Sequence, residues 1–510
     1  MATEPSAQRS YRAACPNCGA PVEFRSAASA FAVCGFCKSQ LARDGEALRR
    51  IGQSAELFGD HPPLQLGASG RSQGSVVTLV GRLQCRNSQG TSNEWHALFD
   101  TEDGGRSAWL SEDNGRYVLA FDVPLRGAVP PADALRPGAP LVVDGQRWSV
   151  ASVAAAKLIA AQGELPFTPK LERGFVVANL RNAQGEVGTI DYSDPAAPKW
   201  SIGRSVALSE LAMTGLKEAT AEKTLTARGL ACPSCGAAVE VKLESTQSVV
   251  CGQCHAVIDI SKGLGGELAH FKQEEGDVEP QIPLGSTGHL ALGGKRALPW
   301  QVVGYVERCD IPAPDSEDDQ TFWREYLLYH RSEGFAFLVD AQDGWSWVVP
   351  ITGAPDKPGE VVRWGGDGYK RMYTYEAQAT WVLGEFYWKL ARDEKTTNTD
   401  YQGMGSARHK RLNREESKTD GMAEVVWSAG ETIDAEAVRK AFRLPSDRLE
   451  ALKRDTGARA LRAVCEELML DVMYELPEQG RGGKYVIDED VVIGKKKLFD
   501  RKPAEQRKSA

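Results

Sequence analysis

Four pairs of cysteines, each of the form C-x-x-C, constrain this chain more than any other feature of its sequence. The pairs come in two sets, and in each set fifteen residues separate the first pair from the second. A C-x-x-C pair closes a tight loop that points two thiolates at one spot. A second pair at this distance completes a tetrahedral sulfur site of the kind that zinc prefers. The spacing therefore predicts two zinc ribbons.

The predicted zinc ligands form two groups of four. They are Cys15, Cys18, Cys34 and Cys37 in the first ribbon, and Cys232, Cys235, Cys251 and Cys254 in the second. Four thiolates leave no open position for water, so we expect both zinc ions to be structural and not catalytic. A hairpin of this size buries too little apolar surface to fold alone. Metal binding should therefore supply most of its folding free energy.

One alternative exists for the second ribbon. Cys251, Cys254 and His255 also match the C-x-x-C-H spacing of a covalent haem attachment site. The first ribbon has Lys38 in place of His255, and both ribbons carry a further cysteine pair that haem attachment does not need. The duplicated spacing favours zinc.

Length and charge limit the class of protein. At 510 residues the chain is long enough for about three or four domains. Its formal net charge of -8 argues against a general nucleic-acid binder, which would carry a basic stripe. Cys85, Cys309 and Cys465 are scattered and typical of small core residues. Thiolate sites and single thiols together suit a reducing compartment, so we predict a cytoplasmic protein, and no run is apolar enough to span a membrane.

Short runs rich in β-branched and aromatic residues, separated by turn signals, follow each ribbon. Their order is similar in the two blocks, which predicts homologous β-rich domains with Trp95 and Trp323 in equivalent strands. The predicted boundaries are 12–42 for the first ribbon, 60–217 for the first β-rich domain, 228–262 for the second ribbon and 280–445 for the second β-rich domain.

Four stretches of these blocks have a less regular pattern. Residues 43–55 are charged and predict a connector with a short helix, and residues 154–161 fit a strand or a helix equally well. The second block is predicted to be extended by residues 375–390, which have no partner in the first. Residues 392–421 are polar and predict an excursion or linker.

Three signatures accompany the ribbons: Asn93-Glu94-Trp95, the run Trp109-Leu-Ser-Glu-Asp-Asn-Gly115, and Gly384-Glu-Phe-Tyr-Trp388. On these, the chain resembles a bacterial family of unknown function, in which ribbons of the form C-P-x-C-G precede β-rich domains. The resemblance covers about residues 12–445. It implies an architecture and brings no reaction with it.

Residues 446–500 differ in character, with a helical apolar stripe over 456–473 followed by two strand-like runs. This predicts a small α+β module, and the stretch resembles the small C-terminal domain of the ClpX unfoldase. In that family the arginine of the Gly-Ala-Arg motif, here Arg459, senses bound ATP. The large domain that grips ATP in that family has no counterpart in this sequence.

The predicted fold class is therefore multidomain and mainly β, with two ribbons, two homologous β-rich domains and an α+β C-terminal module. The sequence has no phosphate-binding loop, no H-E-x-x-H and no G-x-S-x-G elbow, so we expect no enzymatic activity and no ATP cofactor. We predict a zinc-binding scaffold that contacts other proteins.

Two alternatives belong to other classes. The first is a partial or degenerate Clp-type unfoldase subunit that would work with a Clp-type ring. The second is a nucleic-acid reader that uses the ribbons, which the few basic residues of 15–37 and 232–254 disfavour, because phosphate contacts dominate such binding.

Overall fold

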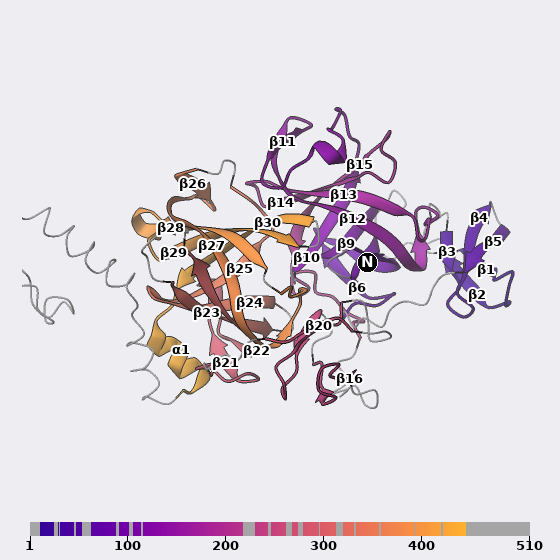
Figure 1. The fold of residues 1–510 in the computed structure, drawn as a ribbon. Helices are drawn as coiled ribbons and strands as arrows, with labels where there is room; N and C mark the ends of the chain where they lie inside the picture. The colour runs from indigo at the N-terminus through magenta and orange to yellow at the C-terminus, as the bar shows by residue number, and fades with distance from the viewer. Residues whose placement is uncertain are drawn as a thin grey trace, which may run out of the picture.

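The computed structural model in Figure 1 describes most of the chain up to residue 444. The described residues are 11–24, 29, 31–44, 47–53, 63–87, 91–100, 106–113, 116–217, 230–242, 246–261, 268–273, 279–294, 296–312, 320–330, 333–355, 359–392, 394–419 and 422–444. The predicted module at 446–500, with Arg459 and Cys465, lies outside them.

Eight antiparallel strands of the first half pair in a closed ring, in the order β7-β8-β9-β10-β15-β14-β13-β12 and back to β7. Their bounds are β7 (Ser75–Arg86), β8 (Thr91–Phe99), β9 (Arg106–Asp113), β10 (Arg116–Val123), β12 (Gln146–Leu165), β13 (Gly174–Arg181), β14 (Glu186–Asp191) and β15 (Lys199–Val206). β6 (Ser69–Ser72) pairs antiparallel with β7, and β11 (Pro140–Val143) pairs antiparallel with β12.

The second half repeats this ring strand for strand, in the order β22-β23-β24-β25-β30-β29-β28-β27 and back to β22. The bounds are β22 (Leu298–Ile311), β23 (Phe322–His330), β24 (Gly334–Ala341), β25 (Gly344–Ile351), β27 (Asp367–Phe386), β28 (Lys395–Gly403), β29 (Lys410–Thr419) and β30 (Met422–Thr432). β21 (Thr287–Leu290) pairs antiparallel with β22, and β26 (Val361–Trp364) pairs antiparallel with β27.

Even the irregularities of the two rings correspond. β7 and β22 each carry a bulge one residue before a glycine, Gly81 or Gly304, that pairs with both neighbouring strands. The fold class and the duplication are thus confirmed. Trp95 and Trp323 do lie in equivalent strands, β8 and β23, although register makes Tyr326 the counterpart of Trp95.

The local sequence explains the tight hairpins within each ring. Asp144 and Gly145 connect β11 to β12 with φ of 48° and 82°, and Gly365 and Gly366 connect β26 to β27 with φ of 58° and 88°. Two consecutive residues with positive φ form a type I′ turn, whose twist matches that of the paired strands. These turns fix the register in which the long strands β12 and β27 begin.

Contacts between distant strands identify the inner face of the second ring. Glu325 on β23 and Glu415 on β29 are four strands apart by either route, which is about 19 Å along a sheet. Both nevertheless contact the guanidinium of Arg308, at 3.2 and 3.3 Å. These contacts cross the inside of the ring, so the face that bears Arg308 points inward and the alternate residues point outward.

The outward faces are apolar and other segments cover them. Trp95 packs with Leu64, Leu208 and Leu211 from the segments before and after the first ring. In the second half, the short helix α1 (Ala435–Phe442) packs Val438 and Phe442 against the outer face. Three short 3-10 turns complete the elements: η1 (Ala132–Ala134), η2 (Leu292–Gly294) and η3 (Gly405–Ala407).

Each ribbon joins its ring through hydrogen-bonded strands, as Figure 1 shows for β3 beside β12. The first ribbon contains β1 (Tyr11–Ala14), β2 (Pro21–Phe24), β3 (Phe31–Val33), β4 (Ser39–Asp44) and β5 (Ala47–Gln53). The second contains β16 (Leu230–Ala231), β17 (Ala238–Val239), β18 (Ser248–Val250), β19 (Val257–Asp259) and β20 (His270–Phe271). β3 pairs with the end of β12, and β18 pairs with the end of β27.

Three predictions about single stretches are wrong. The expected helix within 43–55 is instead β5, paired with β4. The expected extension at 375–390 is part of β27, which is the counterpart of β12. The expected excursion at 392–421 contains β28 and β29, two strands of the second ring whose polar side chains bond to one another. The ambiguous residues 154–161 are strand, within β12.

The two rings touch where β12 meets β30, and the backbone N–H of Ala354 donates to the carbonyl of Asn182 at 3.0 Å. Among the described residues, no helix has the length and apolar character that a membrane crossing requires.

Candidate metal centres

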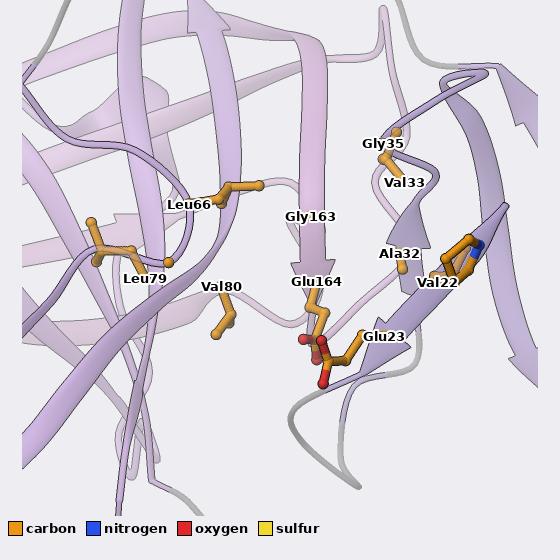
Figure 2. A pocket seen from close by; sticks show the side chains of 12 residues that line it. Val22, Glu23, Ala32, Val33, Gly35, Leu66, Leu79, Val80, Gly163 and Glu164 are labelled. Carbon is orange, nitrogen blue, oxygen red and sulfur yellow. The ribbon is translucent and has the colours of Figure 1, made fainter. Parts of the chain in front are cut away.

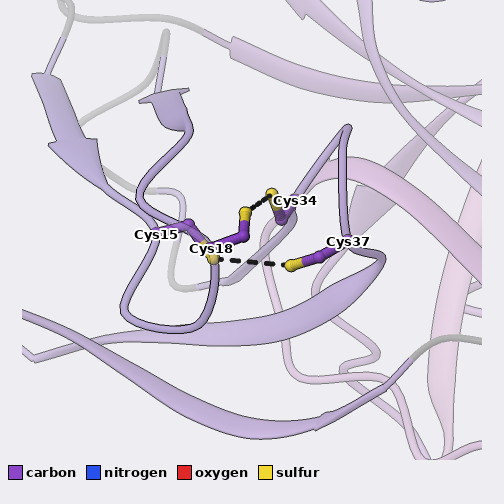
Figure 3. A group of neighbouring side chains, drawn as sticks. All are labelled: Cys15, Cys18, Cys34 and Cys37. Atoms are coloured by element: carbon purple, nitrogen blue, oxygen red, sulfur yellow. Dashed lines mark hydrogen bonds between the residues drawn. The ribbon is translucent and has the colours of Figure 1, made fainter.

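The structure brings the four predicted cysteines of the first ribbon together, as Figure 3 shows. The Sγ atoms of Cys15 and Cys37 are 3.7 Å apart, and those of Cys18 and Cys34 are 3.6 Å apart. A tetrahedron of sulfurs around zinc, with bonds of about 2.3 Å, has edges of about 3.8 Å. The cluster therefore has the dimensions of a four-thiolate zinc site.

The second ribbon repeats this geometry. Sγ atoms of Cys232 and Cys254 are 3.6 Å apart, and those of Cys235 and Cys251 are 3.8 Å apart. In both clusters the first and third cysteines are buried, the second is exposed and the fourth is intermediate. Among the described residues, these are the two groups of side chains that converge as metal ligands do.

Each cysteine pair sits in a turn that needs a left-handed residue directly after its second cysteine. Gly19 and Gly236 fill that position in the first turns, with φ of 75° and 77°. Lys38 and His255 fill it in the second turns, with φ of 56° and 54°. His255 therefore holds the turn position that Lys38 holds in the first ribbon, while Cys251 and Cys254 belong to the four-sulfur cluster. This geometry favours the metal interpretation of the C-x-x-C-H run over haem.

Local hydrogen bonds make the thiols of one cluster unequal. Proximity to the Ser39 hydroxyl lowers the pKa of Cys37 to about 5, and the Ala256 N–H lowers that of Cys254 to about 6. For Cys18 and Cys235 a backbone N–H also favours the thiolate, but the neighbouring sulfurs and burial outweigh it and raise both pKa values to about 12. A bound dication would displace the remaining protons, so metal affinity should rise with pH.

The ribbons are fixed to the rings next to the sulfur clusters. Val33 pairs with Gly163 of β12, and the next residue is the ligand Cys34. In the second ribbon, the Glu385 carboxylate of β27 accepts hydrogen bonds from the Lys242 N–H at 2.9 Å and the Thr246 hydroxyl at 2.7 Å. The position of each sulfur cluster therefore depends on the end of one long ring strand, β12 or β27.

A cleft of about 240 Å³ marks the seam between the first ribbon and its ring. Figure 2 shows Glu23 from the ribbon and Glu164 from β12 with their carboxylates on the same side of this cleft. The rest of its wall is small and apolar, with Val22, Ala32 and Val80. It contains no sulfur ligand, so the cleft is a boundary between two packed units.

One family model matches both rings of the chain. The model described as "Domain of unknown function (DUF4178)" matches residues 65–208 and 293–435. The chain belongs to the DUF4178 family. Each match spans one closed ring, so one DUF4178 domain corresponds to one eight-stranded ring, and this chain carries two. The matched residues do not include the sulfur clusters.

Among solved structures, the chain is similar to a protein of unknown function from the DUF3598 family of Nostoc punctiforme. The identity is 7%, and the alignment covers 72% of this chain and 96% of that chain with a TM-score of 0.12. A score this low does not establish a shared fold.

The inner faces of the DUF4178 rings carry charged side chains that the sequence analysis did not single out as a site. Arg308, Glu325 and Glu415 form a bridge across the second ring, and Glu94 lies inside the first. A partial signal was present, because Glu94 and Glu325 each stand within a strand, directly before a large aromatic residue. Only the closed ring brings them opposite the residues of β14 and β29.

The two described cysteines outside the clusters, Cys85 and Cys309, are buried, as expected of core residues. Cys85 on β7 and Cys309 on β22 are free thiols. Gln320 donates from Nε2 to the Cys309 Sγ at 3.0 Å.

Proposed function

We propose that the protein is a non-enzymatic scaffold in which each ribbon binds one structural zinc ion and thereby fixes the end of a long strand in the adjoining DUF4178 ring. The observation that carries this proposal is the place of the second cysteine pair. In both ribbons it directly follows a strand, β3 or β18, that is hydrogen-bonded to β12 or β27. Four sulfurs at tetrahedral spacing support zinc as the metal.

Zinc content tests this proposal. The full chain, purified under reducing conditions, should contain two zinc ions by elemental analysis. Cys18→Ser and Cys235→Ser should each lose one, because three thiolates hold the ion less well. Cys85→Ala is the matched control, since this buried cysteine lies outside both clusters and its variant should retain two ions. One ion or none in the unaltered chain would contradict the proposal.

Protein partners and a cytoplasmic location are part of the same proposal. Thiolate ligands persist best in a reducing compartment. At the tip of the first ribbon, between two ligands, Phe36 is 78% exposed, and an exposed aromatic ring favours contact with another protein. Gln253 occupies the equivalent position in the second ribbon.

The partner proposal is tested by capture from native lysate with zinc retained. Proteins that contact the ribbon tip should be lost on Phe36→Gln, which gives the first ribbon the residue of the second. Equal recovery with both forms, and with the metal-free chain, would contradict it. The Clp-type alternative has no support among the described residues or the comparisons, so we do not propose it as the function.

A further inference from the structure

The inner faces of the two DUF4178 rings have the same architecture but carry their cations at different positions, Arg308 on β22 in the second ring and Lys199 on β15 in the first. In the second ring, Arg308 Nε lies 3.2 Å from Glu325 Oε2, and its Nη1 lies 3.3 Å from Glu415 Oε2. The carboxylates come from β23 and β29, on opposite sides of the ring. One guanidinium thus joins the two walls, through an ion pair with Glu325 and a charge-assisted hydrogen bond to Glu415.

Register identifies the counterparts of these three residues in the first ring. Cys85 follows Gly81 by four residues, as Arg308 follows Gly304. Glu94 and Glu325 each stand two residues before the partner of that glycine. Asp191 on β14 and Glu415 on β29 occupy the same position in the strand register of their two rings. The first ring therefore keeps both carboxylates and has a short neutral thiol where the second has its guanidinium.

The carboxylate of Glu94 has no cation in contact. Within the described residues it makes no hydrogen bond or ion pair, and burial, followed by the charges of Asp191 and Asp122, raises its pKa to about 7. Asp191 accepts hydrogen bonds from the N–H and hydroxyl of Ser193, at 2.7 and 3.1 Å. Lys199 lies near Asp122 and offsets part of the desolvation that raises the pKa of this carboxyl group. The first ring does carry a cation on this face, because Lys199 of β15 is the register partner of Asp191. Its charge is not among those that shift the pKa of Glu94, so it is the Glu94 side of the pair that lacks a cation.

The surroundings of Glu94 suit a flat cation better than a metal ion. On the inner face, Ala154 takes the place of the larger Tyr375 of the second ring. Trp109, two residues from the register partner of Glu94, lies beside Phe167 with ring centroids 6.0 Å apart, and Lys199 Nζ lies 5.1 Å from the Phe167 centroid. Phe337 and Trp388 repeat this aromatic pair in the second ring at 5.9 Å. Aromatic faces attract guanidinium groups. The carboxylates do not converge as metal ligands, because among the described residues only the cysteine clusters do.

Solvent reaches this part of the ring. Glu94 and Asp191 are partly exposed, and Asp122 is exposed. We propose that the first DUF4178 ring binds a guanidinium group between Glu94 and Asp191, at the place that Arg308 occupies in the second ring. The group comes from a free guanidinium compound or from an arginine side chain of a protein. The second ring supplies its own guanidinium and needs no ligand.

Calorimetric titration of the zinc-loaded full chain tests the site. The probes are methylguanidinium and two blocked tripeptides, Gly-Arg-Gly and its uncharged isostere with citrulline. We expect binding of one site per chain by a guanidinium probe and none by the citrulline peptide. Tighter binding of the arginine peptide would show that the natural ligand is an arginine side chain of a protein. Binding of methylguanidinium but of neither peptide would show that it is a small molecule.

Variants then locate the binding. Glu94→Gln and Asp191→Asn should each weaken it by about tenfold or more, because each removes a charged acceptor. Glu172→Gln is the matched control, an exposed carboxylate of the same ring, and should bind unchanged. Cys85→Arg should abolish binding, since it gives the first ring the guanidinium of the second.

A reciprocal experiment keeps the proposal testable even where one variant fails to fold. Arg308→Cys should lower the melting temperature of the chain. Added methylguanidinium should then raise the melting temperature of this variant more than that of the unaltered chain. Absence of any guanidinium binding by the unaltered chain would overturn the proposal. So would equal binding of the citrulline peptide, or binding that survives Glu94→Gln.

Discussion

Gly81 of β7 and Gly163 of β12 are direct register partners, and neither position has room for a side chain. A Cβ on Gly81 would overlap the carbonyl oxygen of Glu164, and one on Gly163 would overlap that of Val80. The second ring repeats this approach with Gly304 and Gly384. In both rings, closure therefore depends on direct contact between the backbones of two neighbouring strands. This contact lies at the strand end where the ribbon attaches.

Replacing these glycines should destabilise the ring severely. Gly81→Ala forces a backbone shift, and we expect a loss of about 3 kcal/mol or more in the free energy of unfolding by chemical denaturation. Gly163→Ala adds the strain of φ +70°. Gly35→Ala is the control, because a Cβ there meets no atom within 4 Å and no positive φ is required. A loss below about 1 kcal/mol in Gly81→Ala would contradict the account.

Removing Arg308 should cost more than removing a surface arginine. Arg308→Met leaves Glu325 and Glu415 inside the ring without their cation. Their side chains are 17% and 32% exposed, so the cost should lie between that of a surface pair and the about 3–5 kcal/mol of a fully buried one. Arg204→Met is the comparison, since Arg204 is 69% exposed in its pair with Glu186 and should cost about 1 kcal/mol or less. Denaturant unfolding of both variants measures the loss of unfolding free energy in each. Equal losses would show that the Arg308 bridge does not stabilise the ring.

Metal removal should loosen each ribbon before it affects the rings. A chelator with a reductant should increase hydrogen exchange first at Phe31–Val33 and Ser248–Val250, because the sulfur clusters fix these short strands. The apolar cores around Trp95 and Tyr326 should retain their protection, since they are formed by ring strands and their covering segments. Simultaneous loss of protection in ribbons and rings would instead mean that metal and ring fold as one cooperative unit.

The zinc ligands and the duplication could be predicted from sequence because both depend on local spacing. Turn signals and aromatic residues recur in the same order, and Cys34 and Cys251 follow the same number of residues after the first pairs. The equivalence of β12 and β27 could not be predicted, because an alanine-rich strand and a tyrosine-containing strand share little besides the Gly-Glu pairs at 163–164 and 384–385.

The strands β28 and β29 escaped prediction for a different reason. Their side chains are polar, which normally indicates a solvated segment, but here they satisfy one another inside the ring. Asn413 donates to Asp400 at 2.9 Å, and Tyr375 donates to the same carboxylate at 2.9 Å. The ion pairs of Arg308 escaped prediction for the same reason. Such partners lie far apart in the chain, and only ring closure brings them together.

The C-terminal resemblance to the ClpX small domain yields a separate prediction. The sequence contains no phosphate-binding loop, so nothing in it would position ATP for Arg459 to sense. Purified protein should hydrolyse ATP no faster than background, and Arg459→Ala should leave that rate unchanged. Turnover that this single substitution abolishes would contradict the non-enzymatic proposal and make the chain an ATP-driven machine.

Glu94 should make the stability of the first ring fall as pH rises. Its pKa is raised from 4.5 to about 7 in the folded chain, chiefly by burial and then by Asp191 and Asp122. Between these values the folded state binds the proton more tightly than the unfolded state does. The free energy of unfolding therefore decreases through this range, by on the order of 3 kcal/mol in full. His96 opposes part of this decrease below its ordinary pKa, because burial lowers its pKa and the unfolded state binds that proton more tightly. The comparison with Glu94→Gln separates the two contributions.

Denaturant unfolding at a series of pH values measures this slope. Glu94→Gln removes the titrating group, so the variant should lose most of the decrease and be more stable than the unaltered chain near pH 8, where Glu94 is ionised. Glu172→Gln changes an exposed carboxylate of the same ring and should keep the original slope. Added methylguanidinium should flatten the slope in the unaltered chain only, because a bound cation stabilises the ionised carboxylate. A slope that Glu94→Gln leaves intact would assign the pH dependence to another group and remove Glu94 as its cause.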